Sequence, residues 1–141
     1  MIHVDANILI YVCRREMKLH TRCKEWLETS LESGEIVGVS DIVVSAVTRI
    51  TSHPKIFNEP LPIAQPLEFF NALFGLPNVR RIAPGPRHWS IFTDLCLQSG
   101  ARGNLVQDAY LAALAIEHDA EWVSADADFS RFPTLKWRRL A

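Results

Sequence analysis

The sequence has few cysteines and no long apolar segment, and each shortage excludes a class of protein. The three cysteines, Cys13, Cys23 and Cys96, form no Cys-x-x-Cys pair, and the five histidines do not cluster, so neither disulfides nor a zinc site are expected. No stretch approaches about 18 apolar residues, and the N-terminus has neither a basic region nor an apolar signal core. We therefore expect a cytoplasmic protein without membrane contact.

An excess of charge of either sign is also missing. The chain carries 15 Lys and Arg against 16 Asp and Glu, a formal net charge of -1. A nucleic-acid-binding protein with this balance must separate its charges into patches. The 141 residues, 48% hydrophobic and 22% charged, are typical of one packed domain over 1–141, which excludes disordered and fibrous architectures.

Short β-like runs alternate with helical patterns along the chain. We predict strands at 2–4, 36–39, 79–83 and 122–124, with a last edge strand within 135–140. The helices between them include one after Gly85 with an apolar stripe that contains Trp89, and one over 105–118 that Asn104 can cap. This alternation predicts an α/β fold, a central parallel sheet flanked by helices on both faces, with ligand sites at the carboxyl ends of the strands.

Three acidic residues fall where such a site is expected. Asp5 ends the first strand, Asp126 follows a late one, and Asp108 lies in the first turn of the helix over 105–118, on its apolar side. Clustered carboxylates repel one another and raise their own pKa values unless a divalent cation neutralises them. Oxygen ligands favour Mg²⁺ or Mn²⁺, which can orient a phosphodiester and activate water. Asp128, from the same turn as Asp126, is a further candidate.

Each of these residues also has a purely structural interpretation. Asp5 can end a strand in a turn, Asp108 can complement a helix dipole, and Asp126 with Asp128 can form an Asx turn. Two polar neighbours also have two interpretations each. Asn7 can position a carboxylate or cap a helix. Ser124 can form a hydrogen bond near the cluster or be a small strand residue. Spacing alone does not decide between these interpretations.

Taken together, segments 4–9, 107–115 and 124–132 resemble the acidic motifs of the PIN-domain nucleases, and among them the VapC-type toxins of bacterial toxin–antitoxin pairs. The segment 43–57 and Gly103-Asn104-Leu105 are similar to a subgroup common in mycobacterial toxins. The resemblance implies a metal-dependent endoribonuclease of tRNA or ribosomal RNA that blocks translation. It also implies a homodimer held inactive by a VapB-type antitoxin. Asp5 and Asp108 are then the main metal ligands, and Asp126 completes the site.

The sequence departs from the family at one acidic position. The Glu that normally stands three residues before Arg49 is Ala46 here, and Asp41 lies too far around the helix to replace it. This loss motivates an alternative hypothesis, a PIN-like RNA-binding module with little catalysis. A receiver-like phosphoacceptor domain ranks last, because no lysine follows a late strand.

Arginines outnumber lysines 11 to 4 and are candidates for binding phosphate. The arginines in segments that could rim the cleft are Arg14, Arg15, Arg80, Arg81, Arg87 and Arg102, while Arg49 follows the missing acid. For any one of them, a solvated surface position is the favoured interpretation, because charged residues mostly lie on the surface. The four tryptophans are interpreted as core residues rather than platforms for stacking on bases. Trp137, beside Arg138 and Arg139, is the one to examine for base stacking.

Overall fold

Five strands form one parallel sheet in the order β3-β2-β1-β4-β5, in a computed structural model that describes residues 1–141. The strands are β1 (Ile2–Val4), β2 (Val37–Ser40), β3 (Val79–Ile82), β4 (Glu121–Ser124) and β5 (Trp137–Arg139). The helices are α1 (Ala6–Cys13), α2 (His20–Glu32), α3 (Asp41–Thr51), α4 (Ala64–Phe74), α5 (His88–Ser99) and α6 (Asn104–Glu117), with a 3₁₀ helix η1 (Ala127–Arg131). No helix combines the length and the apolar composition that crossing a membrane requires.

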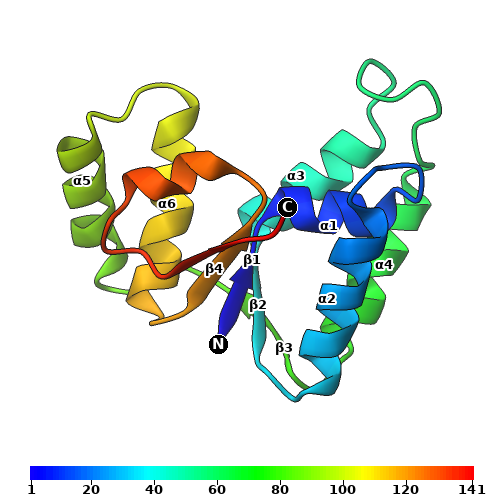
Figure 1. The fold of residues 1–141 in the computed structure, drawn as a ribbon, viewed down its shortest axis with the longest axis horizontal. Helices are drawn as coiled ribbons and strands as arrows, with labels where there is room; N and C mark the ends of the chain where they lie inside the picture. Colours follow the sequence, from blue (N-terminus) through cyan, green and yellow to red (C-terminus); the bar gives the residue numbers. More distant parts are fainter.

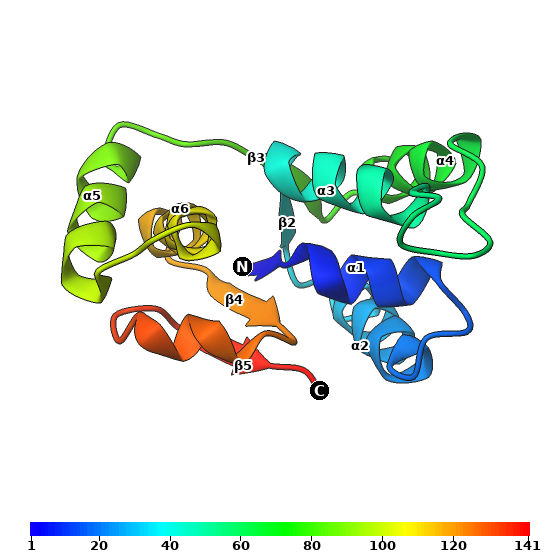
Figure 2. The same cartoon turned by 90° about the horizontal axis from the view of Figure 1, so that it is seen from above.

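Helices cover both faces of the sheet. Figures 1 and 2 show α1 to α4 on one side of the strands and α5 and α6 on the other. Because both faces are covered, the central strands are apolar on both sides, and Val4, Val39 and Val123 are almost fully buried. The predicted α/β fold with a parallel sheet is therefore confirmed.

The order of the strands places a ligand crevice between β1 and β4. From β1 the chain adds β2 and β3 on one side and then returns to add β4 and β5 on the other. In open parallel sheets, ligands bind outside the carboxyl ends of the strands at the point where the order reverses. Asp5 directly follows β1, and Asp126 follows β4 by two residues, so both lie at this point.

Two details of the expected helices are wrong. Asn104 does not cap α6 but is its first residue, and no side chain caps this helix. The cap position is Gly103, with φ 56° and ψ -127°, a conformation that glycine tolerates and Asn does not. In α5, Trp89 is 71% exposed rather than buried, because the inward face of the helix carries His88 and Leu95 instead.

Candidate metal centre

Asp5 is the innermost acid of the site. Its side chain is only 8% exposed, and its backbone N–H continues the β1–β4 ladder by donating to the Val123 carbonyl at 2.9 Å. The carboxylate accepts hydrogen bonds from the Ala6 N–H at 2.7 Å and from the Ser124 hydroxyl at 2.6 Å. One oxygen thus caps the start of α1 and the other contacts β4, which fixes the orientation of the carboxylate.

Asn7 and Ser124 tie the two acidic segments together. The Asn7 amide donates to Asp5 Oδ2 at 3.3 Å and to Ser124 Oγ at 3.2 Å, while its Oδ1 accepts the Ala125 N–H at 3.1 Å. The Ser124 hydroxyl also accepts the Asp126 N–H at 3.0 Å. Of the alternatives left open for these two residues, the structure favours positioning of carboxylates, because Asp5 itself occupies the cap position of α1.

Three further carboxylates converge beside this network. Oxygen atoms of Asp108, Asp126 and Asp128 all lie within 4.8 Å of one another. The turn that begins η1 brings two of them together, since Asp126 Oδ1 accepts the Asp128 N–H at 2.9 Å. The third comes from the second turn of α6, where Asp108 is half-buried. Asp126 and Asp128 therefore form the Asx turn of the structural interpretation and the acidic cluster at once.

The electrostatics of these acids agree with their geometry. Burial raises the pKa of Asp5 from 3.8 to about 6, although Ser124 and Ala6 donate hydrogen bonds to it, and the charge of Asp126 adds to the rise. The pKa of Asp108 is likewise raised to about 6, first by burial and then by the charges of Asp126, Asp5 and Asp128. None of the ion pairs in the protein involves any of these carboxylates. Their mutual repulsion is thus not relieved by any ion pair with a basic side chain.

The donor set fits a divalent cation. Carboxylate oxygens are the ligands that hard cations prefer, and those of Asp108, Asp126 and Asp128 are close enough for one ion to contact several of them after small side-chain rotations. Asp5 lies beside them, near enough for its charge to raise the pKa of Asp108. A bound cation would offset the repulsion that no basic residue offsets here.

Arg14 and Arg87 do not rim this cluster. Arg14 is buried, and its guanidinium carbon lies 4.0 Å from the centre of the Phe57 ring. Arg87 donates to the backbone carbonyl of Glu117. Glu117 ends α6 nine residues after Asp108, about 13 Å further along the helix. Neither candidate is therefore at the cleft, because the tertiary fold carries these segments away from the carboxyl ends of β1 and β4.

The arginines of β3 are also engaged elsewhere. Arg80 donates to the Pro77 carbonyl, and Arg81 forms an ion pair with Asp41 at 2.7 Å. The remaining two predicted arginines, Arg15 and Arg102, are exposed and have no side-chain partner. Of these two, Arg102 precedes α6 by two residues, at the end of the helix that carries Asp108.

No acid from α3 joins the cluster. Ala46 is half-buried in the second turn of α3, and Asp41 is exposed at its start, where it pairs with Arg81. Asp41 therefore does not replace the missing Glu, as its spacing predicted. The carboxylate that the sequence left undecided, Asp128, brings the number of acids at the site to four.

Sequence reasoning missed one basic residue next to the site. The Arg139 Nε donates to the Ala125 carbonyl at 3.3 Å, immediately before Asp126. The available signal was the position of Arg139 in the last strand, but only the pairing of β5 with β4 places it beside this loop.

Comparisons with known proteins agree with this arrangement. The family model of the PIN domain matches residues 2–135. Ribonuclease VapC43 of Mycobacterium tuberculosis is 36% identical over 138 residues, which cover 98% of this chain and 94% of that protein. Ribonuclease VapC25 of the same organism is 32% identical over 136 residues, 96% of each chain.

Solved structures share the fold at low sequence identity. One match is a chain in the structure of VapBC2 from Rickettsia felis bound to a DNA fragment from its promoter. The TM-score is 0.70 and the identity 18%, and the match covers 100% of each chain. FitAcB from Neisseria gonorrhoeae has a chain with TM-score 0.67 and 17% identity, covering 97% of this chain and 96% of that one.

The fold and the site together define a class of protein, a doubly wound α/β domain with an acidic cluster at the reversal point of its sheet. Within that class, the chain belongs to the PIN-domain family.

Proposed function

We propose that the protein is the toxin of a type II toxin–antitoxin system, a metal-dependent endoribonuclease that hydrolyses RNA phosphodiester bonds and thereby inhibits translation. The observation that carries this proposal is the convergence of Asp108, Asp126 and Asp128 near the buried Asp5. The similarity to the ribonucleases VapC43 and VapC25 over nearly the whole chain supports it. On this view residues 1–141 act as one PIN domain, in the cytoplasm.

We propose Mg²⁺, with Mn²⁺ as the substitute, as the cation held by Asp5, Asp108, Asp126 and Asp128. When bound, such an ion neutralises charge on a phosphodiester and lowers the pKa of water. The roles of the protein residues follow from their contacts. Ser124 and Asn7 hold Asp5 in one orientation, and the Asp126–Asp128 turn presents its carboxylates toward solvent, where an RNA strand can approach.

We propose that a VapB-type antitoxin binds this protein, and an apolar groove on the surface supports this proposal. The groove encloses about 400 Å³ between α2 and α4 and is lined mainly by Leu27, Leu31, Leu73 and Leu76. Leu76 is 39% exposed, so an apolar segment of a partner would remove it from water. We also propose a homodimer, as for the family the chain belongs to.

The proposal is tested by incubating the purified protein with total RNA and Mg²⁺ and mapping the ends of the fragments. We expect cuts at discrete sites, abolished by EDTA, by Asp5→Asn and by co-purification with the cognate antitoxin. Asp41→Asn is the matched control, because this acid lies at the carboxyl end of β2 but is paired with Arg81. Cleavage that persists in EDTA or in the Asp5→Asn protein would refute the proposal, whereas RNA binding without any cleavage by the wild type would favour the RNA-binding alternative.

A further inference from the structure

Five of the eleven arginines are committed to protein groups away from the acidic cluster. Three of them form ion pairs with carboxylates, and two donate to backbone carbonyls away from the site; these are Arg14, Arg81, Arg138, Arg80 and Arg87. Arg139 differs, because its one protein contact lies at the acidic cluster. Its Nε donates to the carbonyl of Ala125, the residue between Ser124 and Asp126.

The register of the sheet holds Arg139 in this place. Arg139 is the direct partner of Ser124 in the β4–β5 pair, so the two side chains emerge on the same face. The next residue fixes the strand, because the Leu140 N–H donates to the Ser124 carbonyl at 2.9 Å. Ser124 is also the residue whose hydroxyl contacts Asp5. The base of the Arg139 side chain is therefore tied to the same strand end as the carboxylates.

The outer part of the Arg139 side chain is free. The residue is exposed and takes part in no ion pair, and the Nη1 and Nη2 groups have no protein partner. A guanidinium held through Nε presents these two groups in a fixed plane, which matches two oxygens of a phosphate. Four carboxylates nearby repel the phosphates of an RNA strand, and a cationic group beside them would offset this repulsion.

We propose that Arg139 is a substrate-binding residue, which holds an RNA phosphate next to the acidic cluster through Nη1 and Nη2 while Nε remains on the Ala125 carbonyl. This inference rests on the proposed function and deepens it, because it names the protein group that receives the anionic backbone of the substrate.

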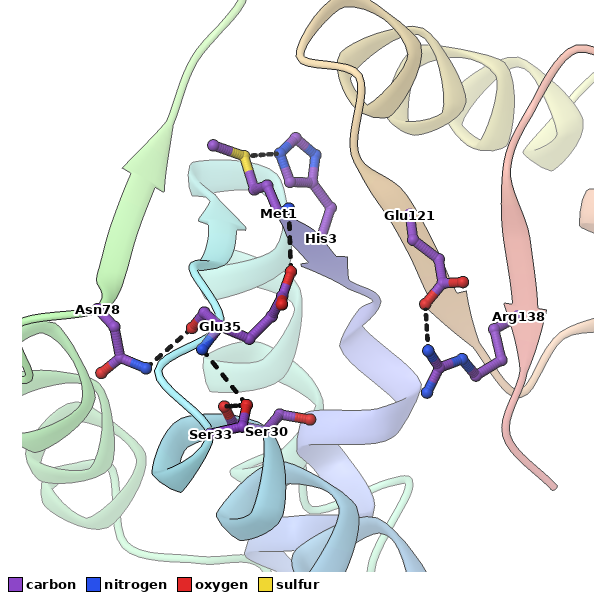
Figure 3. A network of polar contacts seen from close by, with 8 residues as sticks. All are labelled: Met1, His3, Ser30, Ser33, Glu35, Asn78, Glu121 and Arg138. Carbon is purple, nitrogen blue, oxygen red and sulfur yellow. Dashed lines mark hydrogen bonds and ion pairs between the residues drawn. The ribbon is translucent and has the colours of Figure 1, made fainter.

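Arg138 provides a matched control one residue away. It points to the opposite face of the strand, and its Nη2 lies 2.6 Å from Glu121 Oε1 at the start of β4. Figure 3 shows this ion pair between Glu121 and Arg138. Removing Arg138 therefore deletes the same charge from the same strand without touching the proposed phosphate contact.

The test is steady-state cleavage of a synthetic RNA that spans the strongest site found in total RNA. We expect Arg139→Ala to raise KM about tenfold with a smaller effect on kcat, since it removes a charge-assisted contact to phosphate. Arg139→Lys should recover only part of the loss, and Arg138→Ala should change KM less than about twofold. Mn²⁺ affinity should be the same in all variants. An unchanged KM in Arg139→Ala, or an equal rise in Arg138→Ala, would overturn the inference.

A binding measurement separates this inference from the proposed function. In the Asp108→Asn background with EDTA, the same labelled RNA should bind more weakly after Arg139→Ala. The slope of log affinity against log salt should fall by about 0.7, the value for one lost single-strand phosphate contact. If the wild type cuts no RNA, the endoribonuclease proposal fails. An unchanged salt slope instead shows that Arg139 does not bind phosphate. Arg139→Gln, which also removes the charge, replaces the alanine variant in both assays if that variant does not fold.

Discussion

The amino ends and the carboxyl ends of the parallel strands, here called the amino edge and the carboxyl edge of the sheet, differ in how their charged groups are paired. At the amino edge, the Met1 ammonium lies 3.0 Å from Glu35, and Glu121 pairs with Arg138 (Figure 3). The Asn78 amide there donates to two backbone carbonyls. At the carboxyl edge, four carboxylates share a small region without a basic partner, and two of them have raised pKa values. The charged groups at the amino edge are paired, whereas the acidic cluster at the carboxyl ends of β1 and β4 has no ion-pair partner.

This contrast separates what stabilises the protein from what we propose to be its chemistry. Paired surface charges add little to stability. Clustered acids destabilise the folded state, and such groups persist in proteins where function requires them. Substitutions of the same type at the two edges should therefore have opposite consequences.

The largest effect is expected for Asp108→Asn. Cleavage of RNA should fall about a thousandfold, because this side chain is one of the proposed ligands of a cation that supplies several kcal/mol to the transition state. In EDTA at pH 8 the same variant should melt at a higher temperature than the wild type, since one of four repelling charges is gone. Asp41→Asn should change neither property in this direction. A lower melting temperature of Asp108→Asn in EDTA would show that repulsion among the clustered acids does not destabilise the folded state.

The pH dependence of the free energy of unfolding should show the same unfavourable burial and repulsion of carboxylates. Between pH of about 4 and 6, folded Asp5 and Asp108 keep protons that the unfolded chain has released, so their contribution to the free energy of unfolding falls as pH rises. For the buried Asp5 the shift of about two pKa units corresponds to roughly 3 kcal/mol. His3, whose pKa burial lowers to about 3, acts in the opposite direction up to pH of about 6.5.

A difference measurement removes the contribution of His3. We expect the gain in unfolding free energy of an Asp5→Asn, Asp108→Asn double variant over the wild type to grow from pH 5 to pH 8 in EDTA, measured by urea denaturation. Saturating Mn²⁺ should cancel this gain by stabilising the wild type alone. A gain that is independent of pH would show that the two carboxyl groups titrate normally.

Two asparagines offer a third comparison between the edges. Asn7→Ala should weaken Mn²⁺ binding about 10- to 100-fold in calorimetric titration, because its amide orients Asp5 and holds the Ala125 N–H. Asn78→Ala removes an equivalent amide at the amino edge and should lower the melting temperature while leaving Mn²⁺ affinity unchanged. Equal losses of affinity in the two variants would mean that Asn7 acts through general stability.

The acids were predictable from the sequence for a local reason. Asp5 and Asp126 directly follow apolar runs, and parallel strands bring their carboxyl ends to one edge, so alternation of elements suffices to place them. Asp108 required only the helical period. The same reasoning left Asp128 open, because its contribution depends on the Asx turn that starts η1.

The basic residues were not predictable in the same way. Arg87 follows a strand as Asp5 does, yet the chain after β3 crosses to the far end of α6, where Glu117 accepts its hydrogen bond. Trp89 has the apolar spacing of a core residue, but α5 is an outer helix that packs on α6 and leaves this side chain exposed. In both cases helical period or strand position was insufficient, because the outcome depends on which neighbour the fold supplies.

The smallest effect is expected at the amino edge itself. Glu35→Gln removes the partner of the Met1 ammonium, a half-exposed pair, and should lower the free energy of unfolding by less than about 1 kcal/mol. RNA cleavage and Mn²⁺ affinity should not change, since the residue precedes β2 and the acidic cluster follows β1 and β4. Urea denaturation and the cleavage assay on one preparation suffice. A loss of cleavage larger than the loss of stability would show that the two edges are coupled, because a substitution at the amino edge would then alter the geometry of Asp5 through β1.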